Sequence, residues 1–322
     1  MNLEILTQKI INGHEITYDE AEQLLEVPLN QLTKQANILR KHFCGNKFDA
    51  CTIINIKSGK CGENCIFCSQ SIHHQTNIKE YPLMSNNELE KQSLMIYEKG
   101  VNRVSFVASG KNIEDDEFKQ LIKSIKKLND NYENLKICVS LGLLTENQIK
   151  ILKKYNVDRI HNNLETSENF FKNICSTHFF NDKIETLKVL KNEDINICSG
   201  GIFGLGESFG NRIELAFKLK SFGIKSIPIN ILHPIAGTPV ENCDILTNEE
   251  VCKIIAIFRF INPDSFIRLA GGRSLLEDNG KKAFQSGCNA AILGNMLTTD
   301  GVLIDNDIEM IKKLGYEITY DI

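Results

Sequence analysis

The sequence of 322 residues lacks the long hydrophobic runs and charge blocks that mark several classes of protein. No apolar stretch approaches the roughly 20 residues that span a bilayer, so no membrane span is expected. The first residues, MNLEILTQKIINGHE, lack the basic start, apolar centre and small-residue cleavage site of a secretory signal. The formal net charge of −4 gives no reason to expect a nucleic-acid partner. We therefore expect a soluble, cytoplasmic protein.

The sequence also lacks low-complexity linkers and short repeats, and what recurs instead is a strand followed by an amphipathic helix. Such alternation implies parallel strands with right-handed crossovers, and eight units favour a closed (βα)₈ TIM-type barrel over an open doubly wound sheet. Apolar spacing over Thr17–Leu25 and Leu29–Lys41 predicts an N-terminal helical cap over residues 1–45, ahead of a barrel domain over residues 46–322. The eight predicted strands are Thr52–Ser58, Arg103–Ser109, Lys136–Leu141, Asp158–Glu165, Asn196–Phe203, Ser226–Leu232, Ser265–Ala270 and Ala290–Leu293.

Alternate residues of five of these strands are polar, although a barrel interior is usually filled by branched apolar side chains. In Lys136–Leu141, for example, Cys138 and Ser140 lie opposite the face of Ile137 and Val139. The apolar face would pack on the helices and the polar face would line the interior. The sequence therefore predicts a cavity inside the barrel that holds a ligand.

Eleven cysteines are many for a chain expected in a reducing compartment, where disulfides are rare. Six of them have no neighbouring thiol at ligand spacing, and we interpret them as small buried packing residues. These six are Cys44, Cys51, Cys175, Cys243, Cys252 and Cys288.

Three other cysteines, Cys61, Cys65 and Cys68, follow the first predicted strand with the spacing C-x3-C-x2-C. Three thiolates can hold three corners of a 4Fe–4S cluster and leave the fourth iron open as a Lewis acid and electron donor. A structural zinc site with His73 or His74 as fourth ligand is the alternative. A ferredoxin-like carrier would need four cysteines per cluster, so iron–sulfur chemistry with an open iron is favoured.

This triad resembles the signature of the radical S-adenosylmethionine superfamily. The resemblance implies a 4Fe–4S cluster and S-adenosylmethionine as cofactors, which supply a 5′-deoxyadenosyl radical, so no side-chain acid or base is needed as a catalyst. Phe67 matches the aromatic residue beside the adenine. The stretch Gly201–Glu207, GIFGLGE, is similar to the glycine-rich motif on the adenine side, which assigns Gly204 and Glu207 to cofactor binding.

From about Ile54 to Thr299 the chain resembles the biotin synthase family, through NIKSGKCGENCIFCSQS, NNLETS, ICSGGIFGLGES, SIPINIL, IRLAGGR and GNMLTT. The resemblance implies sulfur insertion into dethiobiotin to form biotin, a flavodoxin or ferredoxin as electron donor, and a homodimer. It assigns Asn163 to both S-adenosylmethionine and dethiobiotin, and Glu165 to the ribose hydroxyls. It assigns Asn230 to the ureido ring of dethiobiotin, and Thr298 and Thr299 to the substrate carboxylate.

The same family uses an auxiliary 2Fe–2S cluster as sulfur donor, held by three cysteines and one arginine. Cys138, Cys198 and Arg268 match three of these ligands, but Ser105 stands where the family has its first cysteine. A hydroxyl is a much poorer ligand than a thiol, because only the deprotonated form ligates well. Four alternatives stay open: Ser105 binds as an alkoxide, another cysteine substitutes, a variant cluster uses Cys138 and Cys198 alone, or the auxiliary site is lost.

Two rival functions follow from these observations. The first is a related radical enzyme with another substrate and an altered auxiliary cluster, since hydrogenase-maturation and pyrrolysine-biosynthesis enzymes share this barrel. The second is a non-catalytic iron–sulfur or zinc protein. The polar barrel interior argues against the second, because a carrier needs no cavity.

Overall fold

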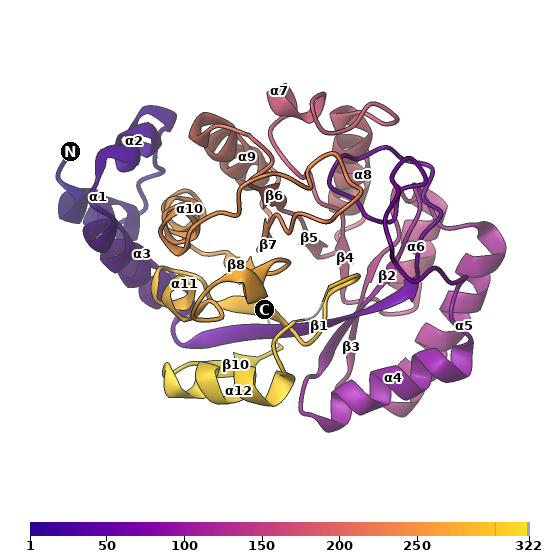
Figure 1. Cartoon of the computed structure of the whole chain (residues 1–322). Helices are drawn as coiled ribbons and strands as arrows, with labels where there is room; N and C mark the ends of the chain where they lie inside the picture. Colours follow the sequence, from indigo (N-terminus) through magenta and orange to yellow (C-terminus); the bar gives the residue numbers. More distant parts are fainter. Residues whose placement is uncertain (300, 321–322) are drawn as a thin grey trace.

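The computed structural model describes residues 1–299 and 301–320, and its centre is a closed barrel of parallel strands (Figure 1). Neighbouring strands pair in chain order, and the last barrel strand pairs with the first, so the predicted (βα)₈ TIM-type barrel is confirmed. The barrel strands are β1 (Lys47–Lys57), β2 (Arg103–Ala108), β3 (Lys136–Ser140), β4 (Arg159–His161), β5 (Ile197–Cys198), β6 (Gly201–Phe203), β7 (Ser226–Ile231), β8 (Phe266–Leu269) and β9 (Ala290–Leu293).

The fifth barrel strand is interrupted, so the prediction of one strand over Asn196–Phe203 is wrong. β5 and β6 both pair with β7, and Ser199 and Gly200 separate them. A Cβ atom on Gly200 would lie 2.0 Å from the carbonyl oxygen of Pro228 on β7. The backbone therefore approaches its neighbour more closely than any residue with a side chain allows.

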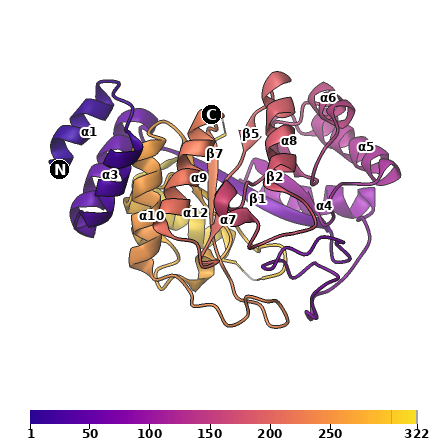
Figure 2. The ribbon, with the colours of Figure 1, turned by 90° about the horizontal axis from the view of Figure 1, so that it is seen from above.

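Helices surround the barrel (Figure 2), and several of them begin at side-chain caps. Ser85, Thr145, Ser208 and Thr247 each accept a hydrogen bond from a backbone N–H in the first turn of the helix that follows. No helix in the described part of the chain is long and apolar enough to cross a membrane. The helical segments after β1 are α4 (Asn86–Glu98), α5 (Asp115–Asn131), α6 (Glu146–Lys154), α7 (Glu168–Phe171), α8 (Phe180–Asn192), α9 (Phe209–Ser221), α10 (Asn248–Ile261), η2 (Arg273–Leu275), α11 (Lys281–Gln285) and α12 (Ile304–Lys313).

Four helical segments precede the barrel and lie against its outer helices (Figure 2). α3 buries Leu32, Ala36 and Leu39, which are three and four residues apart, and packs against α10. These segments cover one side of the barrel and leave the ends of its strands open. They are α1 (Leu3–Ile11), α2 (Tyr18–Gln23), η1 (Leu24–Glu26) and α3 (Leu29–Cys44).

A further strand, β10 (Glu317–Thr319), was not expected from the sequence. It pairs in parallel with Lys47–Asp49, at the start of β1. β1 therefore begins five residues before the predicted strand start at Thr52. The extension places Asp49 and Cys51 within the barrel wall, and both residues belong to the site described next.

Candidate active site

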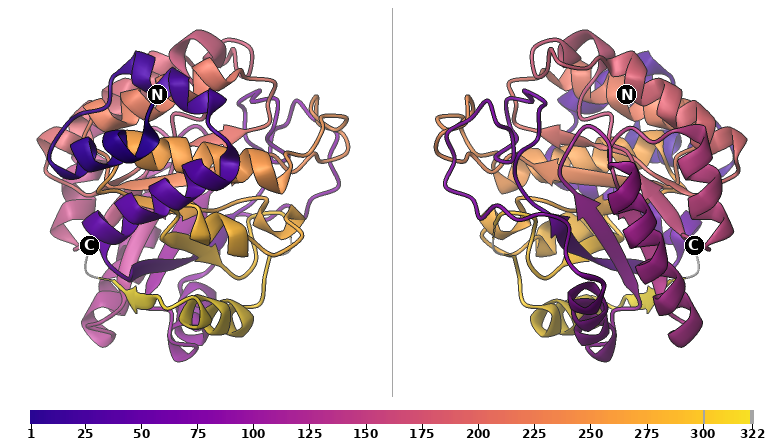
Figure 3. Two further views of the ribbon diagram at one scale, coloured as in Figure 1. Left: turned by 90° about the vertical axis from the view of Figure 1, so that its left-hand side faces the viewer. Right: turned by 90° about the vertical axis from the view of Figure 1, so that its right-hand side faces the viewer.

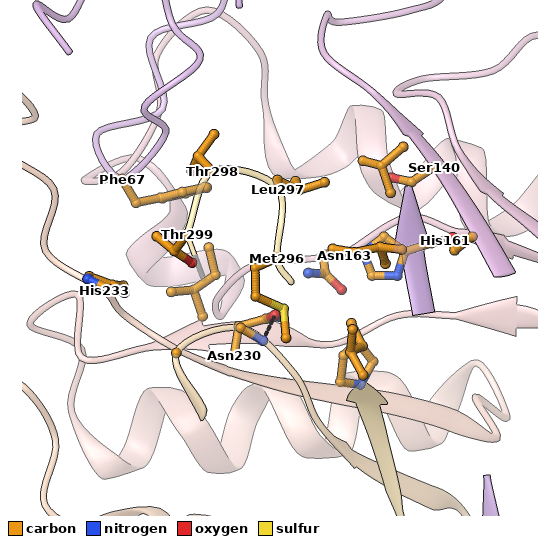
Figure 4. A pocket seen from close by; sticks show the side chains of 18 of the residues that line it. Phe67, Ser140, His161, Asn163, Asn230, His233, Met296, Leu297, Thr298 and Thr299 are labelled. Carbon is orange, nitrogen blue, oxygen red and sulfur yellow. Dashed lines mark hydrogen bonds between the residues drawn. The ribbon is translucent and has the colours of Figure 1, made fainter. Parts of the chain in front are cut away.

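The barrel encloses a cavity of about 350 Å³, lined by the inner faces of the strands and by the loops that follow them. In Figure 4, Phe67, Thr298 and Thr299 lie on one side of this cavity, and His161 and Ser140 lie on the other. The predicted polar interior is therefore real. The structure brings eleven of the predicted site residues together around it: Phe67, Cys68, Ser105, Cys138, Asn163, Glu165, Cys198, Asn230, Arg268, Thr298 and Thr299.

The cysteine triad lies in a long loop between β1 and α4, beside the segment between β7 and α10 (Figure 3). Hydrogen bonds within the loop fold it tightly: the Cys61 N–H donates to the Gln70 carbonyl at 3.0 Å, and the Cys68 N–H donates to the Cys65 carbonyl at 3.0 Å. Cys61, Cys65 and Cys68 all line a second cavity of about 210 Å³, and Cys68 also lines the first. The two cavities thus adjoin each other, and Phe67 and Glu165 line both of them.

A second segment, residues 174–178, is bound to the triad loop, and it corrects one interpretation of the cysteines. The Ile66 N–H donates to the Ile174 carbonyl at 2.9 Å. Cys175 was expected only to fill space, but its Sγ lies 3.6 Å from Sγ of Cys65. In the same segment, Nδ1 of His178 lies 3.2 Å from Sγ of Cys175, and this nitrogen also pairs with the carboxylate of Glu63.

The alternative of a zinc site with His73 or His74 receives no support from the geometry. The Nε2 atoms of His73 and His74 hydrogen-bond to the carbonyls of Gly62 and Cys65, at 3.1 and 3.0 Å. Within the described residues, the group compact enough for one ion is Cys65, Cys175 and His178, whose ligand atoms lie within 4.8 Å of one another. That group uses only one thiol of the triad, so it does not explain Cys61 and Cys68.

Two asparagine amides are held in fixed orientations at the cavity wall. Asn163 Oδ1 accepts from the Gly200 N–H at 2.9 Å, and its amide nitrogen donates to Glu165 at 3.2 Å. Asn230 Oδ1 accepts from the Gly271 N–H at 3.0 Å, and its amide nitrogen donates to the Gly201 carbonyl at 3.0 Å. Each amide keeps one N–H and one lone pair for a ligand, because an amide group offers two of each.

Glu165 adopts a left-handed backbone conformation, with φ of 67°. Its carbonyl accepts from the Ile202 N–H at 2.8 Å, and a Cβ on Gly201 would lie 2.5 Å from that carbonyl oxygen. The glycine therefore permits the contact that turns the Glu165 side chain toward both cavities. Strained residues of this kind are concentrated at functional sites.

Gly204 and Glu207 lie outside the residues that line the two cavities. The buried carboxylate of Glu207 accepts from the N–H groups of Gly204 and Leu205, at 3.0 and 2.7 Å, and pairs with Arg212 at 2.7 Å. Glu207 thus shapes the turn after β6 rather than facing the cavity. Its assignment to the cofactor stays a prediction.

The floor of the cavity is formed by buried charged side chains that sequence reasoning missed, apart from Arg268. The Asp49 carboxylate accepts from Arg103 Nε at 3.1 Å and from Arg159 Nη1 at 3.0 Å, and it also pairs with Arg268. Burial by itself would raise the pKa of Asp49, but the three guanidinium groups outweigh burial and lower it to about 2. Strand parity was a usable signal for Arg159, which is two residues before His161.

Cys198 and Cys51 both lie near this floor, but their thiols have different electrostatic surroundings. Burial opposes the ionisation of Cys198, but His161 and the nearby arginines lower the pKa of its thiol to about 6. Burial and the neighbouring Cys138 raise the pKa of the Cys51 thiol to about 12. His161 therefore acts on a predicted ligand. Cys51, expected as a packing residue, lies on the cavity wall.

The fold resembles solved structures of two other enzymes. The structure of methylornithine synthase superposes with a TM-score of 0.84 at 18% identity, covering 98% of this chain and 97% of that one. The FeFe-hydrogenase maturase from Carboxydothermus hydrogenoformans superposes with a TM-score of 0.80 at 18% identity, covering 99% of this chain and 79% of that one. At this identity the likeness establishes the shared barrel only.

A parallel barrel whose first loop carries C-x3-C-x2-C at the mouth of a polar cavity defines a radical S-adenosylmethionine enzyme, and the model of the Radical SAM superfamily matches residues 55–219. A Biotin and Thiamin Synthesis associated domain matches residues 228–317. The chain is 48% identical to the biotin synthase of Brachyspira hyodysenteriae over 321 residues, covering 99% of this chain and 95% of that protein. It is 50% identical to a biotin synthase of Clostridium botulinum (strain Loch Maree / Type A3) over 311 residues, covering 97% and 98%. The chain belongs to the biotin synthase family.

Proposed function

We propose that this protein inserts sulfur into dethiobiotin to form biotin, with the cysteine triad as ligands of a 4Fe–4S cluster. The observation that carries the proposal is a pair of adjoining cavities. The triad lines one of them, two fixed asparagine amides and two buried thiols line the other, and both are bordered by Phe67, Cys68 and Glu165. When bound, the cluster and S-adenosylmethionine supply a radical that removes hydrogen from an unactivated carbon, and an auxiliary cluster supplies the sulfur. The remaining task of the protein is to hold these groups in line and to exclude water.

The residues near the triad suit S-adenosylmethionine. Phe67 directly precedes Cys68 and borders both cavities, so its ring is placed to lie against an adenine. The carboxylate of Glu165 can accept two hydrogen bonds from a ribose diol. The turn shaped by Gly204 and Glu207 supports the same side of the site through β6.

The opposite part of the cavity suits dethiobiotin. A ureido group offers N–H donors and a carbonyl acceptor, which match the free N–H and lone pair on each of Asn163 and Asn230. Thr298 and Thr299 supply hydroxyl donors for the valeryl carboxylate. Thr298 Oγ1 lies 3.1 Å from Oγ of Ser69, so this end of the site is tied to the triad loop.

Cys138, Cys198 and Arg268 suit an auxiliary iron–sulfur cluster deeper in the barrel. A buried thiol with a lowered pKa, as at Cys198, is ready to bind iron at neutral pH. We further propose a flavodoxin or ferredoxin as electron donor, a homodimeric assembly and a cytoplasmic location. The reduced, oxygen-sensitive chemistry of such clusters is consistent with that location.

The test is an anaerobic assay of the reconstituted protein with dithionite, S-adenosylmethionine and dethiobiotin. We expect both 5′-deoxyadenosine and biotin, and we expect Cys68→Ala to form neither. Cys252→Ala is the matched control, because Cys252 is buried on α10 away from both cavities. Formation of 5′-deoxyadenosine without biotin would indicate a related enzyme with another substrate. Zinc without iron at the triad would contradict the proposed radical chemistry.

A further inference from the structure

Cys51 lies on the cavity side of β1, close to the two predicted ligands of the auxiliary cluster. Side chains alternate along a strand, so Asp49, Cys51 and Ile53 share the inner face of the barrel. Ile53 is paired with Ser105 of β2, and Ser105 is paired with Cys138 of β3. Cys51 is therefore one inner position nearer the floor than Ser105, on the neighbouring strand.

The guanidinium group of Arg268 lies against the backbone of β1 and β9, directly before the level of Cys51. Its Nη1 donates to the Asp49 carbonyl at 3.1 Å and to the carbonyl of Ala291 on β9 at 3.0 Å. The charge of Arg268 acts on both Cys51 and Cys198. Cys51 and Cys198 thus flank the one arginine that the family resemblance assigns to the auxiliary cluster.

Cys138 completes a set of three thiols around this floor. Its Sγ accepts a long contact from Arg103 Nη1 at 3.8 Å, and it interacts electrostatically with Cys51. Arg159 interacts with both Cys138 and Cys198. The three sulfur atoms therefore come from β1, β3 and β5 and face one group of arginines.

Within residues 1–299 and 301–320, the charged groups of the floor include one more guanidinium than carboxylates. The buried Arg103, Arg159 and Arg268 pair there with Asp49 and Asp158. Uncompensated buried charge is costly, and a set of thiolates on iron carries the compensating negative charge. The arginine group therefore favours thiolate ligands above it, and a neutral serine hydroxyl contributes nothing to this balance.

We propose that Cys51, Cys138 and Cys198 are the three thiolate ligands of the auxiliary cluster, and that Ser105 is not a ligand. This inference rests on the proposed function. In this assignment, Cys51 on the adjacent strand β1 supplies the thiolate that the family takes from the position of Ser105. Arg268 remains beside the cluster, and Ser105 lies above it on the wall of the substrate cavity.

The test compares Cys51→Ala, Cys138→Ala and Ser105→Ala, each reconstituted anaerobically as the full chain, by iron and sulfide content and by Mössbauer spectroscopy. We expect Cys51→Ala to lose all the iron that Cys138→Ala loses, while the signal of the triad cluster persists. We expect Ser105→Ala to keep the full iron content. Cys44→Ala is the matched control for a buried cysteine away from the cavities.

Wild-type iron content in Cys51→Ala, or loss of the auxiliary iron in Ser105→Ala, would overturn the assignment. Cys51→Ser keeps the size of the side chain, so a loss of iron there with an unchanged melting temperature of the apoprotein separates ligation from folding. Wild-type protein with auxiliary iron but no biotin formation would contradict the proposed function and leave the ligand assignment intact. Wild-type protein that binds iron only at the triad would contradict the ligand assignment.

Discussion

At the scale of single residues, the chemistry of this site depends on what contacts each sulfur atom. Cys175 is 110 positions from Cys65 in the sequence, yet the two Sγ atoms lie 3.6 Å apart. When Cys65 is bound to iron its sulfur can only accept, so the proton of this contact has to come from Cys175. Hydrogen bonds to ligating sulfur atoms withdraw electron density and raise the reduction potential of an iron–sulfur cluster.

We therefore expect Cys175→Ala to lower the midpoint potential of the triad cluster. One hydrogen bond of about 1 kcal/mol corresponds to roughly 40 mV for a one-electron couple. Redox titration followed by electron paramagnetic resonance measures the shift, with Cys252→Ala as control. An unchanged midpoint potential in Cys175→Ala would show that Cys175 does not influence the cluster and only fills space.

At the scale of secondary-structure elements, alternation along strands predicted most of the site. The inward positions of β3, β7 and β8 follow from period two alone, and they include Cys138, Asn230 and Arg268. The same alternation, continued two residues past the end of β4, reaches Asn163. The start of β1 was not predictable, because the pairing that defines it comes from β10, at the other end of the chain. Cys51 and Asp49 were missed for this reason.

The contact between Cys65 and Cys175 escaped prediction for a related reason. It depends on how the loop after β1 meets the segment after α7, and neither segment has a repeating pattern that sets its path. The break between β5 and β6 had a visible sign, the pair Gly200 and Gly201, but its meaning depends on the close approach of Pro228. Local periodicity therefore fixes which face a side chain takes, and distant partners fix where strands begin and end.

The contact between β6 and Glu165 gives a test at this scale. In Gly201→Ala, the added Cβ would lie 2.5 Å from the Glu165 carbonyl oxygen and 2.6 Å from Cδ2 of Leu215. Overpacking of this kind costs roughly 1–3 kcal/mol, so we expect a lower melting temperature. Because Glu165 moves with its carbonyl, we also expect a higher KM for S-adenosylmethionine, measured by 5′-deoxyadenosine formation.

Gly223→Ala is the control for this substitution, because Gly223 lies after α9, where a Cβ would meet open space. Its positive φ of 71° adds backbone strain, so some loss of stability is expected there without any change in KM. Equal KM values for S-adenosylmethionine in the two variants would show that β6 does not position the cofactor-binding residue Glu165.

At the scale of the whole molecule, the barrel is closed at its floor by charges from four strands. Asp49 on β1 joins Arg103 on β2, Arg159 on β4 and Arg268 on β8. Such a group links parts of the chain that are more than 200 residues apart. Its contribution to the free energy of unfolding therefore depends on the closure of the whole barrel.

This group predicts the acid sensitivity of the apoprotein. The folded pKa of Asp49, about 2, is below its unfolded value, so its stabilisation is complete above about pH 4 and is lost as the pH falls toward 2. The shift corresponds to roughly 2.5 kcal/mol of unfolding free energy. Denaturant unfolding at pH 5 and pH 3 should show a smaller loss in Asp49→Asn than in the wild type, and equal losses would contradict this account.

The bonds that hold the triad loop have a consequence for how the protein is loaded with iron. Ile66 is tied to Ile174, Asn64 to Thr177 and Cys61 to Gln70, and none of these contacts involves a metal. In a zinc finger the ion has to organise a flexible chain, so binding and folding are one event. Here hydrogen bonds to the segment after α7 hold the loop in place, so we expect the triad to bind its cluster without a large change in the fold of this loop.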